Sequence, residues 1–243
     1  MKPNFFTQSR CYTVPHERIG LRAIMIVHQA ITRSFEIIRS EGYALGSALE
    51  NNITEKLENT LENCVRNRNE VEGFDSLFFG KVTRGNEVKN YDGTKTSKKP
   101  DLMFHLHREN RHDWDQCQDA LFAECKPVDH QHTLRGHYCA VEKDCTGIER
   151  FIIGDYAWAM EEALMIGYVR DGFQILPDLE NTLCEPSRNK KLGSPGKLVP
   201  IESSGSLANT HLLYKSCHQR LFSWSNGRQA TPIEIYHSWH NCT

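Results

Sequence analysis

ALFAECK, residues 120–126, is an apolar segment that carries one carboxylate and one ammonium group near its end. Because side chains alternate along a β-strand, Phe122, Glu124 and Lys126 point to one face. Burying either charge costs several kcal/mol unless the charge is paired or bound to a metal. The segment therefore predicts a strand with a functional pair of side chains, ended by Pro127, which cannot donate to a strand ladder.

The strand predicted just before this segment supplies a second carboxylate. In residues 101–107 every second side chain from Leu102 is apolar, and Asp101 stands at the start. A hairpin between the two strands would bring Asp101 beside Glu124. Two adjacent carboxylates repel each other unless a cation lies between them. Since Mg²⁺ and Mn²⁺ prefer ligation by oxygen atoms, the pattern predicts a site for one of these ions.

At Pro100-Asp101 and Glu124-Cys125-Lys126 the sequence resembles the PD-(D/E)xK nuclease superfamily. The resemblance implies that Asp101 and Glu124 bind Mg²⁺ or Mn²⁺ with help from the Cys125 carbonyl group. It also implies that Lys126 positions the nucleophilic water. The activity implied is hydrolysis of phosphodiester bonds; DNA is the preferred substrate, and RNA remains open.

Many members of this superfamily add an acidic residue from the first core helix. Glu50 is the preferred candidate, because it lies just outside the apolar stripe of the helix predicted over about residues 45–66. Glu55, Glu58 and Glu62 on the same helix remain open alternatives. The expected metal ligands are then Asp101, Glu124, Cys125 and Glu50, and the expected catalytic residues are Asp101, Glu124, Lys126 and Glu50.

The pattern of apolar residues predicts an α/β fold in a single domain, residues 1–243. Helices are expected over residues 21–39, 45–66, 147–168 and 207–222, and strands over residues 77–82, 101–107, 120–126, 169–176, 198–201 and 232–237. Residues 185–196 are expected to form an exposed loop. The resemblance implies a restriction-endonuclease-like core (helix, three strands, helix, strand) over about residues 45–176, with an N-terminal helix and a C-terminal extension of helix and strand over about residues 177–243.

The motif is short, so its surroundings matter. A second Glu-x-Lys triplet, Glu87-Val88-Lys89, lies in a turn-like polar region without a preceding Pro-Asp pair. Pro177-Asp178 has no Glu-x-Lys after it. The pair formed by Asp101 and residues 124–126 combines the order, the strand context and the flanking helices. The competing interpretation is a surface hairpin with a cross-strand salt bridge.

Composition limits the classes of protein to which the chain can belong. A formal net charge of −2 argues against a non-specific nucleic-acid coat, which would be basic. The longest apolar runs are too short to span a bilayer, and residues 1–10 lack the apolar stretch of a signal peptide, so a cytoplasmic protein is expected. Among the nine cysteines there is no Cys-x-x-Cys pair. A zinc site in the cluster His130, His132, His137, Cys139 and Cys145 stays open, but free thiols beside loop histidines are preferred.

Other polar residues are weaker candidates for substrate contacts, and structural or solvent-facing roles are preferred for each: Arg150, Tyr156, Gln131 and His132. A second phosphate-contacting patch could be built from His211, Ser216, His218, Arg220 and His237. The preferred interpretation of that region is an amphipathic helix with polar outer residues. Trp158, Trp224 and Trp239 are expected in the core rather than as platforms for stacking bases.

The favoured function is that of a metal-dependent endonuclease, acting as the nuclease subunit of a bacterial anti-phage defence system. A regulatory protein partner such as a helicase or ATPase is expected, since the sequence contains no Gly-x-x-x-x-Gly-Lys-[Ser/Thr] loop of its own. No membrane association is expected. One alternative is a stand-alone homodimeric restriction endonuclease that reads a specific site. Another is a non-catalytic subunit that binds nucleic acid or supports assembly on the same fold.

Overall fold

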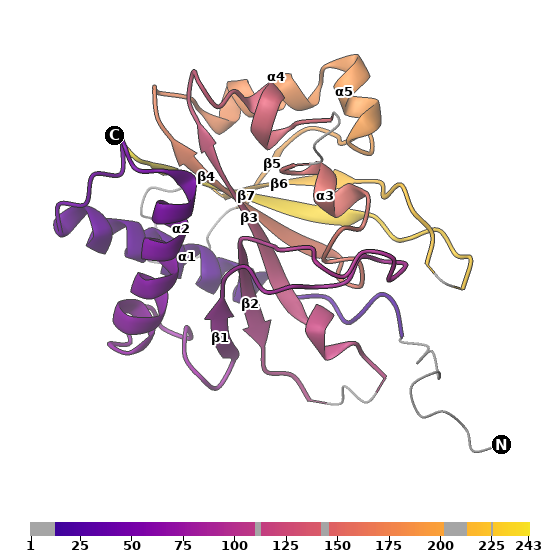
Figure 1. Ribbon diagram of the computed structural model, residues 1–243, viewed down its shortest axis with the longest axis horizontal. Helices are drawn as coiled ribbons and strands as arrows, with labels where there is room; N and C mark the ends of the chain where they lie inside the picture. The colour runs from indigo at the N-terminus through magenta and orange to yellow at the C-terminus, as the bar shows by residue number, and fades with distance from the viewer. Residues whose placement is uncertain (1–12, 110–112, 142–145, 202–212, 225) are drawn as a thin grey trace.

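A mixed β-sheet of seven strands lies at the centre of the fold, in the order β1-β2-β3-β4-β7-β6-β5 (Figure 1). The computed structural model describes residues 13–109, 113–141, 146–201, 213–224 and 226–243. The strands are β1 (Phe79–Thr83), β2 (Leu102–Leu106), β3 (Ala120–Val128), β4 (Glu162–Val169), β5 (Val199–Ile201), β6 (Leu213–His218) and β7 (Ile233–Asn241). The strands β3, β4 and β7 run parallel to one another, and the remaining neighbours are antiparallel.

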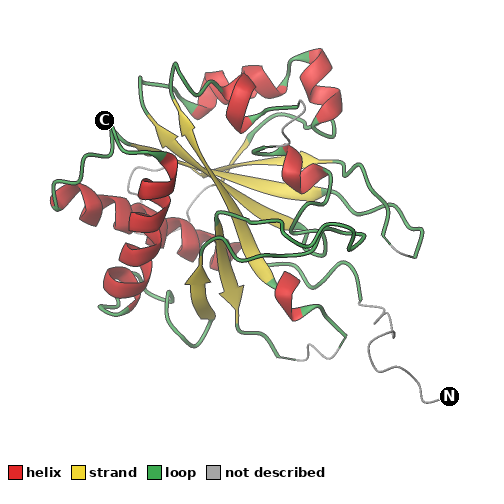
Figure 2. Cartoon of the chain, in the orientation of Figure 1, coloured by secondary structure: helices red, strands yellow, loops and turns green. Residues whose placement is uncertain are grey.

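Helices cover both faces of this sheet (Figure 2). The helices are α1 (Leu21–Ser40), α2 (Glu50–Thr60), α3 (Glu149–Ile152), α4 (Glu180–Leu183) and α5 (Pro186–Lys191), with the single turns η1 (Leu61–Arg66), η2 (Gln116–Gln118), η3 (Leu134–Tyr138) and η4 (Ile175–Leu179). Figure 1 shows α1 and α2 together on one side of the sheet, away from α3, α4 and α5. Every helix in the described part of the chain is too short or too polar to cross a lipid bilayer.

The register of the central strands decides which side chains share a face. Glu124 pairs with Met165, and Lys126 pairs with Gly167, which in turn pairs with Trp239. Because paired residues point to the same side of a sheet, these side chains lie on the face away from α1. The alternate residues face α1, where His28 Nδ1 lies 2.8 Å from Ser238 Oγ.

The α/β class and several predicted elements are confirmed. The helix predicted over residues 21–39 is α1, and its apolar stripe is buried: Ile24, Val27, Ile31, Phe35 and Ile38. The helix predicted up to Arg66 is α2 continued by η1. Strands were predicted correctly at β1, β2, β3, β5 and β7. The expected hairpin also forms, since β2 pairs antiparallel with β3 and Leu102 lies opposite Ala123.

The long helix predicted over residues 147–168 is wrong. Only the single turn α3 is helical, and residues 162–169 form the strand β4. The chain turns between them at Gly154 and Ala157, which adopt φ angles of 74° and 52°. All residues of β4 are buried, because the strand lies between two parallel neighbours with helices on both faces. Such a strand lacks the alternation that distinguishes strand from helix in a sequence.

Three further expectations about the C-terminal half are corrected. The strand predicted over residues 169–176 is a turn at Asp171 and Gly172, which have positive φ angles, followed by η4. Within residues 207–222, the predicted helix is replaced by β6, and residues 207–212 lie outside the described residues. Part of the predicted loop 185–196 is the helix α5, which has proline in its first turn. The expected extension of helix and strand therefore contributes the sheet strands β5, β6 and β7.

Pro127 does not end β3, contrary to the prediction. The strand continues to Val128, with Pro127 opposite Tyr168 of β4. The backbone N–H of Cys125 points toward the β2 side, where it meets Asp101. Residue 127 has the same orientation two positions later, beyond the last β2 partner, so the missing N–H of proline leaves no bond of the sheet unmade.

Candidate functional site

The ammonium group of Lys126 lies among three carboxylates. Its Nζ atom is 2.8 Å from Glu50 Oε1, 3.3 Å from Glu124 Oε1 and 3.6 Å from Asp101 Oδ2. Lys126 and Glu124 are buried, whereas the side chains of Asp101 and Glu50 keep exposed fractions of 23% and 31%. The cluster is therefore open to solvent on the side of Asp101 and Glu50.

The positions of the two partly exposed carboxylates, Asp101 and Glu50, are fixed by contacts with the backbone and by the start of α2. Asp101 comes directly before β2, and its Oδ2 accepts a hydrogen bond of 2.7 Å from the backbone N–H of Cys125. Glu50 is the first residue of α2. Thr54 Oγ1 donates to the Glu50 carbonyl at 2.9 Å and lies 2.9 Å from the hydroxyl group of Tyr168 on β4. The start of α2 is thus tied to the sheet beside the site.

The two oxygen atoms of Glu124 differ in their partners. The hydroxyl group of Tyr156 donates to Oε2. Oε1 is buried and accepts no hydrogen bond from the described residues, although Arg150 Nε lies 3.6 Å from it and Lys126 Nζ 3.3 Å. The Arg150 guanidinium also lies 5.8 Å from the centroid of the Tyr156 ring. One oxygen is fixed by a neutral donor, while the other is buried with two cations near it.

The segment that carries Tyr156 is fixed on both sides. Asp155 forms an ion pair of 2.5 Å with Lys98, from the long connection between β1 and β2. After Tyr156, the buried guanidinium of Arg220 donates hydrogen bonds to three backbone carbonyl groups, those of Ala157, Trp158 and Met160. Because these contacts come from distant parts of the chain, the position of the Tyr156 hydroxyl group depends on the complete fold.

Burial shapes the protonation of the cluster. It raises the pKa of Asp101, and it raises the pKa of Glu124, to which the charge of Asp101 adds. Burial alone would lower the pKa of Lys126, but Coulombic attraction to Glu124, Asp101 and Glu50 outweighs it and leaves the pKa raised. Lys126 is therefore a cation at neutral pH, and it compensates the carboxylates around it.

The four glutamates considered on the first core helix have different partners in the structure. Glu50 reaches Lys126, whereas Glu55 and Glu58 lie 3.5 Å and 3.6 Å from Arg84. Glu62 accepts a hydrogen bond of 2.9 Å from the backbone N–H of Val82 and therefore supports the edge strand β1. These contacts bring Glu50 alone of the four to the carboxylate cluster.

No group of three or more His, Cys, Asp or Glu side chains is arranged to hold a metal ion within the described residues. At Lys126 the carboxylates surround an ammonium group instead. In the histidine cluster weighed as a zinc site, the rings of His132 and His137 lie 5.1 Å apart, and His132 Nδ1 lies 2.9 Å from Asp129. Cys139 is buried, and Cys145 lies outside the described residues.

The second phosphate-contacting patch near the C-terminus is wrong for the residues that the structure describes. Ser216 Oγ lies 2.6 Å from His218 Nε2 and 2.8 Å from His237 Nε2, and all three side chains are buried. The Arg220 guanidinium is equally buried. His211 lies outside the described residues. Buried side chains that are bonded to one another cannot form a surface for phosphate groups.

The structure also shows the surroundings of the other residues considered for substrate contacts. Arg150 and Tyr156 contact Glu124, rather than lying on a helix face toward a substrate. Gln131 is exposed, and His132 bonds to Asp129. As expected, the indole rings of Trp158, Trp224 and Trp239 are buried. The contact between Tyr156 and Glu124 was missed because it depends on the turn at Ala157, within a segment predicted as helix.

Comparison of the chain with protein-family models, with curated proteins and with solved structures gave no match.

Proposed function

We propose that the chain is a metal-dependent nuclease that hydrolyses phosphodiester bonds in DNA. The observation that carries this proposal is the convergence of Glu50, Asp101 and Glu124 on Lys126 at a partly open site. Three carboxylates and one lysine, held by a strand hairpin and the start of a helix, match the chemistry that such hydrolysis requires.

The arrangement of elements supports a restriction-endonuclease-like core. The described elements α2, β1, β2, β3, α3 and β4 follow one another in the order helix, three strands, helix and strand. The motif residues lie at the start of β2 and within β3, which is where the resemblance to PD-(D/E)xK nucleases requires them. The helix of this order that follows β3 is the single turn α3.

The donor atoms fit a magnesium or manganese ion. Carboxylate oxygens are the ligands that these ions prefer, and buried Glu124 Oε1 accepts no hydrogen bond from the described residues. The backbone N–H of Cys125 points to Asp101, and the carbonyl group of the same residue points to the same side of the strand. We infer that Asp101, Glu124 and the Cys125 carbonyl hold the ion, with Glu50 completing the ligand set.

We assign each side chain of the cluster a different role in the hydrolysis. When bound, the ion neutralises charge on the phosphate and lowers the pKa of an attacking water. Lys126, a cation with three carboxylates beside it, donates hydrogen bonds to that water and to oxygen atoms that gain charge in the transition state. Tyr156 and Arg150 keep the carboxylate of Glu124 in one orientation.

Cleavage of supercoiled plasmid, linear duplex and single-stranded DNA with Mg²⁺ or Mn²⁺ tests the proposal. Glu124→Ala and Lys126→Ala should abolish cutting. The matched controls are Glu87→Ala and Lys89→Ala, which change the other Glu-x-Lys triplet in an exposed loop and should cut as the wild type does. Equal cutting by the Glu124 and Lys126 variants would assign the activity to a contaminant and overturn the proposal. If no protein cuts, absence of Mg²⁺ or Mn²⁺ binding by the wild type would overturn it as well.

A further inference from the structure

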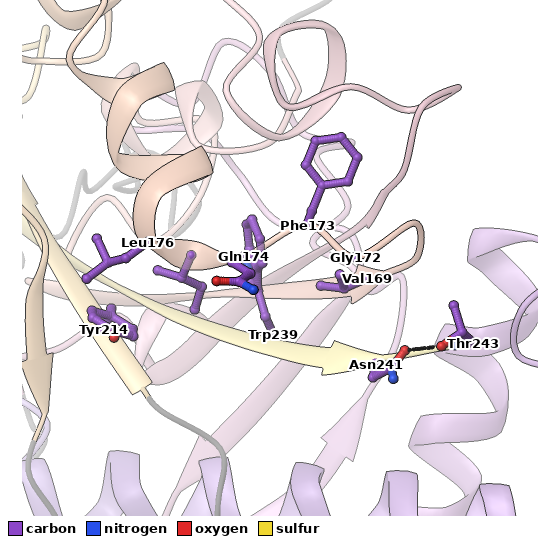
Figure 3. Close-up of a pocket in the computed structure, with 10 residues that line it drawn as sticks. Val169, Gly172, Phe173, Gln174, Leu176, Tyr214, Trp239, Asn241 and Thr243 are labelled. Carbon is purple, nitrogen blue, oxygen red and sulfur yellow. Dashed lines mark hydrogen bonds between the residues drawn. The ribbon is translucent and has the colours of Figure 1, made fainter.

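A pocket of about 450 Å³ lies at the carboxyl ends of the parallel strands β4 and β7 (Figure 3). Its walls come from three parts of the chain: Val169 at the end of β4, Trp239 and Asn241 on β7, and Tyr214 on β6. The loop after β4 covers this surface and contributes Gln174. Crevices at the carboxyl ends of parallel strands are common positions for ligands in open α/β sheets.

The pocket opens on the same face of the sheet as the carboxylate cluster. Lys126 pairs with Gly167 and Gly167 with Trp239, so the three positions form one row across the sheet. Tyr214 pairs with His237, two residues before Trp239, and therefore points to this face too. Two strand spacings separate the backbones of Lys126 and Trp239, about 10 Å. The buried side chain of Tyr138 lies on this face between the cluster and the pocket, so the two sites share a face but are separate.

The indole ring of Trp239, which lines the pocket, is held by contacts with η3 and β4. Its Nε1 donates a hydrogen bond of 3.0 Å to the hydroxyl group of Tyr138. Its indole ring lies over Gly167, where a Cβ atom would come within 2.5 Å of the ring. Glycine at this position therefore leaves the space that the indole ring occupies. A rigid aromatic wall suits a flat ligand, since no side-chain freedom is lost on binding.

The lining groups indicate a neutral planar ligand that can both donate and accept hydrogen bonds. None of the ten lining residues has a charged side chain, which disfavours a phosphate group inside the pocket. Three aromatic residues, Phe173, Tyr214 and Trp239, supply apolar surface. The side-chain amides of Gln174 and Asn241 each offer a donor and an acceptor, as the edge of a nucleobase requires. The volume is within the range of small-molecule sites.

We propose that this pocket binds one unpaired nucleobase of a single-stranded substrate. The proposal rests on the proposed nuclease function and adds the substrate class to it. The base stacks on the aromatic surface of Tyr214 and Trp239, and Gln174 and Asn241 bond to its edge. A base within an intact duplex is paired and stacked, so it cannot enter.

Binding of short fluorescent single-stranded oligonucleotides in EDTA tests the pocket without any cleavage. One abasic site is moved along the oligonucleotide, one nucleotide at a time, and the Kd is measured by fluorescence anisotropy. In the wild type, the abasic site should weaken binding about 10-fold at one position, because stacking of one base contributes on the order of 1–3 kcal/mol. Tyr214→Leu should remove this difference, and Gln174→Ala should reduce it.

Gln116→Ala is the matched control, since Gln116 is exposed and belongs to η2, outside the pocket lining. It should keep the full difference. Gln174 is also exposed, so its variant is expected to fold even if Tyr214→Leu does not. Equal binding of all abasic oligonucleotides by the wild type would overturn the pocket assignment, as would tighter binding of blunt duplex than of single strands. The binding measurements use no metal and no cleavage, so they test the pocket separately from the nuclease proposal. The pocket assignment can be overturned while Glu124→Ala still abolishes cleavage, and it can be supported even if no protein cuts DNA.

Discussion

Asp101 Oδ2 and the backbone N–H of Cys125 form a hydrogen bond of 2.7 Å at the point where the ladder between β2 and β3 ends. The carbonyl group of Pro100, which would lie opposite Cys125 in a longer β2, accepts from the backbone N–H of Gly85 instead, so the Asp101 carboxylate acts as the acceptor for Cys125. The same carboxylate lies 3.6 Å from Lys126 Nζ. Asp101 therefore combines a structural role with its proposed role as a metal ligand, and substitution can separate the two.

Asp101→Asn should keep the fold and lose the metal. The amide oxygen can still accept from Cys125, so the free energy of unfolding should stay within about 1 kcal/mol of the wild type. The rise in Tm with Mg²⁺ or Mn²⁺, which ligand linkage predicts for the wild type, should disappear. Asp101→Ala should lose stability as well, by about 1–3 kcal/mol, because the Cys125 N–H is left without its acceptor. A normal rise in Tm for Asp101→Asn would contradict the assignment.

Lys126→Met should destabilise the protein in a pH-dependent way. Removing the ammonium group leaves buried carboxylates uncompensated, which costs about 3–5 kcal/mol at pH 8. The pKa values of Glu124 and Asp101 are already raised by burial, so these groups stabilise the folded state when protonated and lose that contribution as the pH rises. The variant should thus recover stability relative to the wild type between pH 8 and pH 5. Denaturant unfolding across this range, with Lys89→Met as the control, measures the effect.

Tyr156→Phe should remove the hydrogen bond to Glu124 Oε2 and leave the packing of the buried ring unchanged. A bond to a charged group in a buried site contributes about 1.5–3 kcal/mol, so the free energy of unfolding should fall by that order. The affinity for Mn²⁺, measured by calorimetry, should fall with it because the orientation of Glu124 is no longer fixed. Unchanged stability and unchanged metal affinity together would show that the tyrosine does not position the carboxylate.

The buried histidines should make the fold sensitive to acid. Burial lowers the pKa of His218 to about 4 and that of His237 to about 3. An unfolded histidine takes up a proton near pH 6.5, so below that pH the unfolded state binds protons that the folded state does not. Stability should fall between about pH 6.5 and pH 4 by about 1.4 kcal/mol per pH unit for each histidine.

His218→Gln tests the contribution of one histidine. The variant is expected to be less stable at pH 7, since the bonds to Ser216 and to the Leu192 carbonyl change. Its loss of stability per pH unit between pH 6 and pH 4.5 should nevertheless be smaller, by about 1.4 kcal/mol. Identical slopes for variant and wild type would mean that His218 already carries its proton in the folded state.

The N-terminal half of the sheet and its carboxylate cluster could be predicted from local patterns. Alternation around Glu124 and Lys126 identified β3, and the Pro100-Asp101 pair marked the start of β2. Both signals lie within a few residues of the side chains concerned. The choice of Glu50 could not be made from the helix pattern, since four glutamates lie on that helix. It depends on how α2 meets the sheet, through Thr54 and Tyr168.

The rest depended on contacts between distant segments. β4 is buried on both faces, so its residues show no alternation, and its apolar run favours a helix in the sequence. That error hid the turn that brings Tyr156 to Glu124. The pocket was not predicted, because its walls come from β4, β6, β7 and the loop after β4. The sequence predicts helices at β4 and β6 and a shorter strand at β7. No local pattern links Tyr214 to Trp239, which become neighbours through the pairing of β6 with β7.

Pro127 has a consequence for what can occupy the gap beside the cluster. Beyond Ala123, the edge of β3 that faces β2 pairs with no strand among the described residues, and the backbone N–H of Cys125 bonds to the Asp101 side chain. An added strand, from this chain or another, would need a backbone donor at residue 127, and proline has none. Pro127 thus disfavours β-sheet extension and aggregation at this edge, beside the carboxylate cluster.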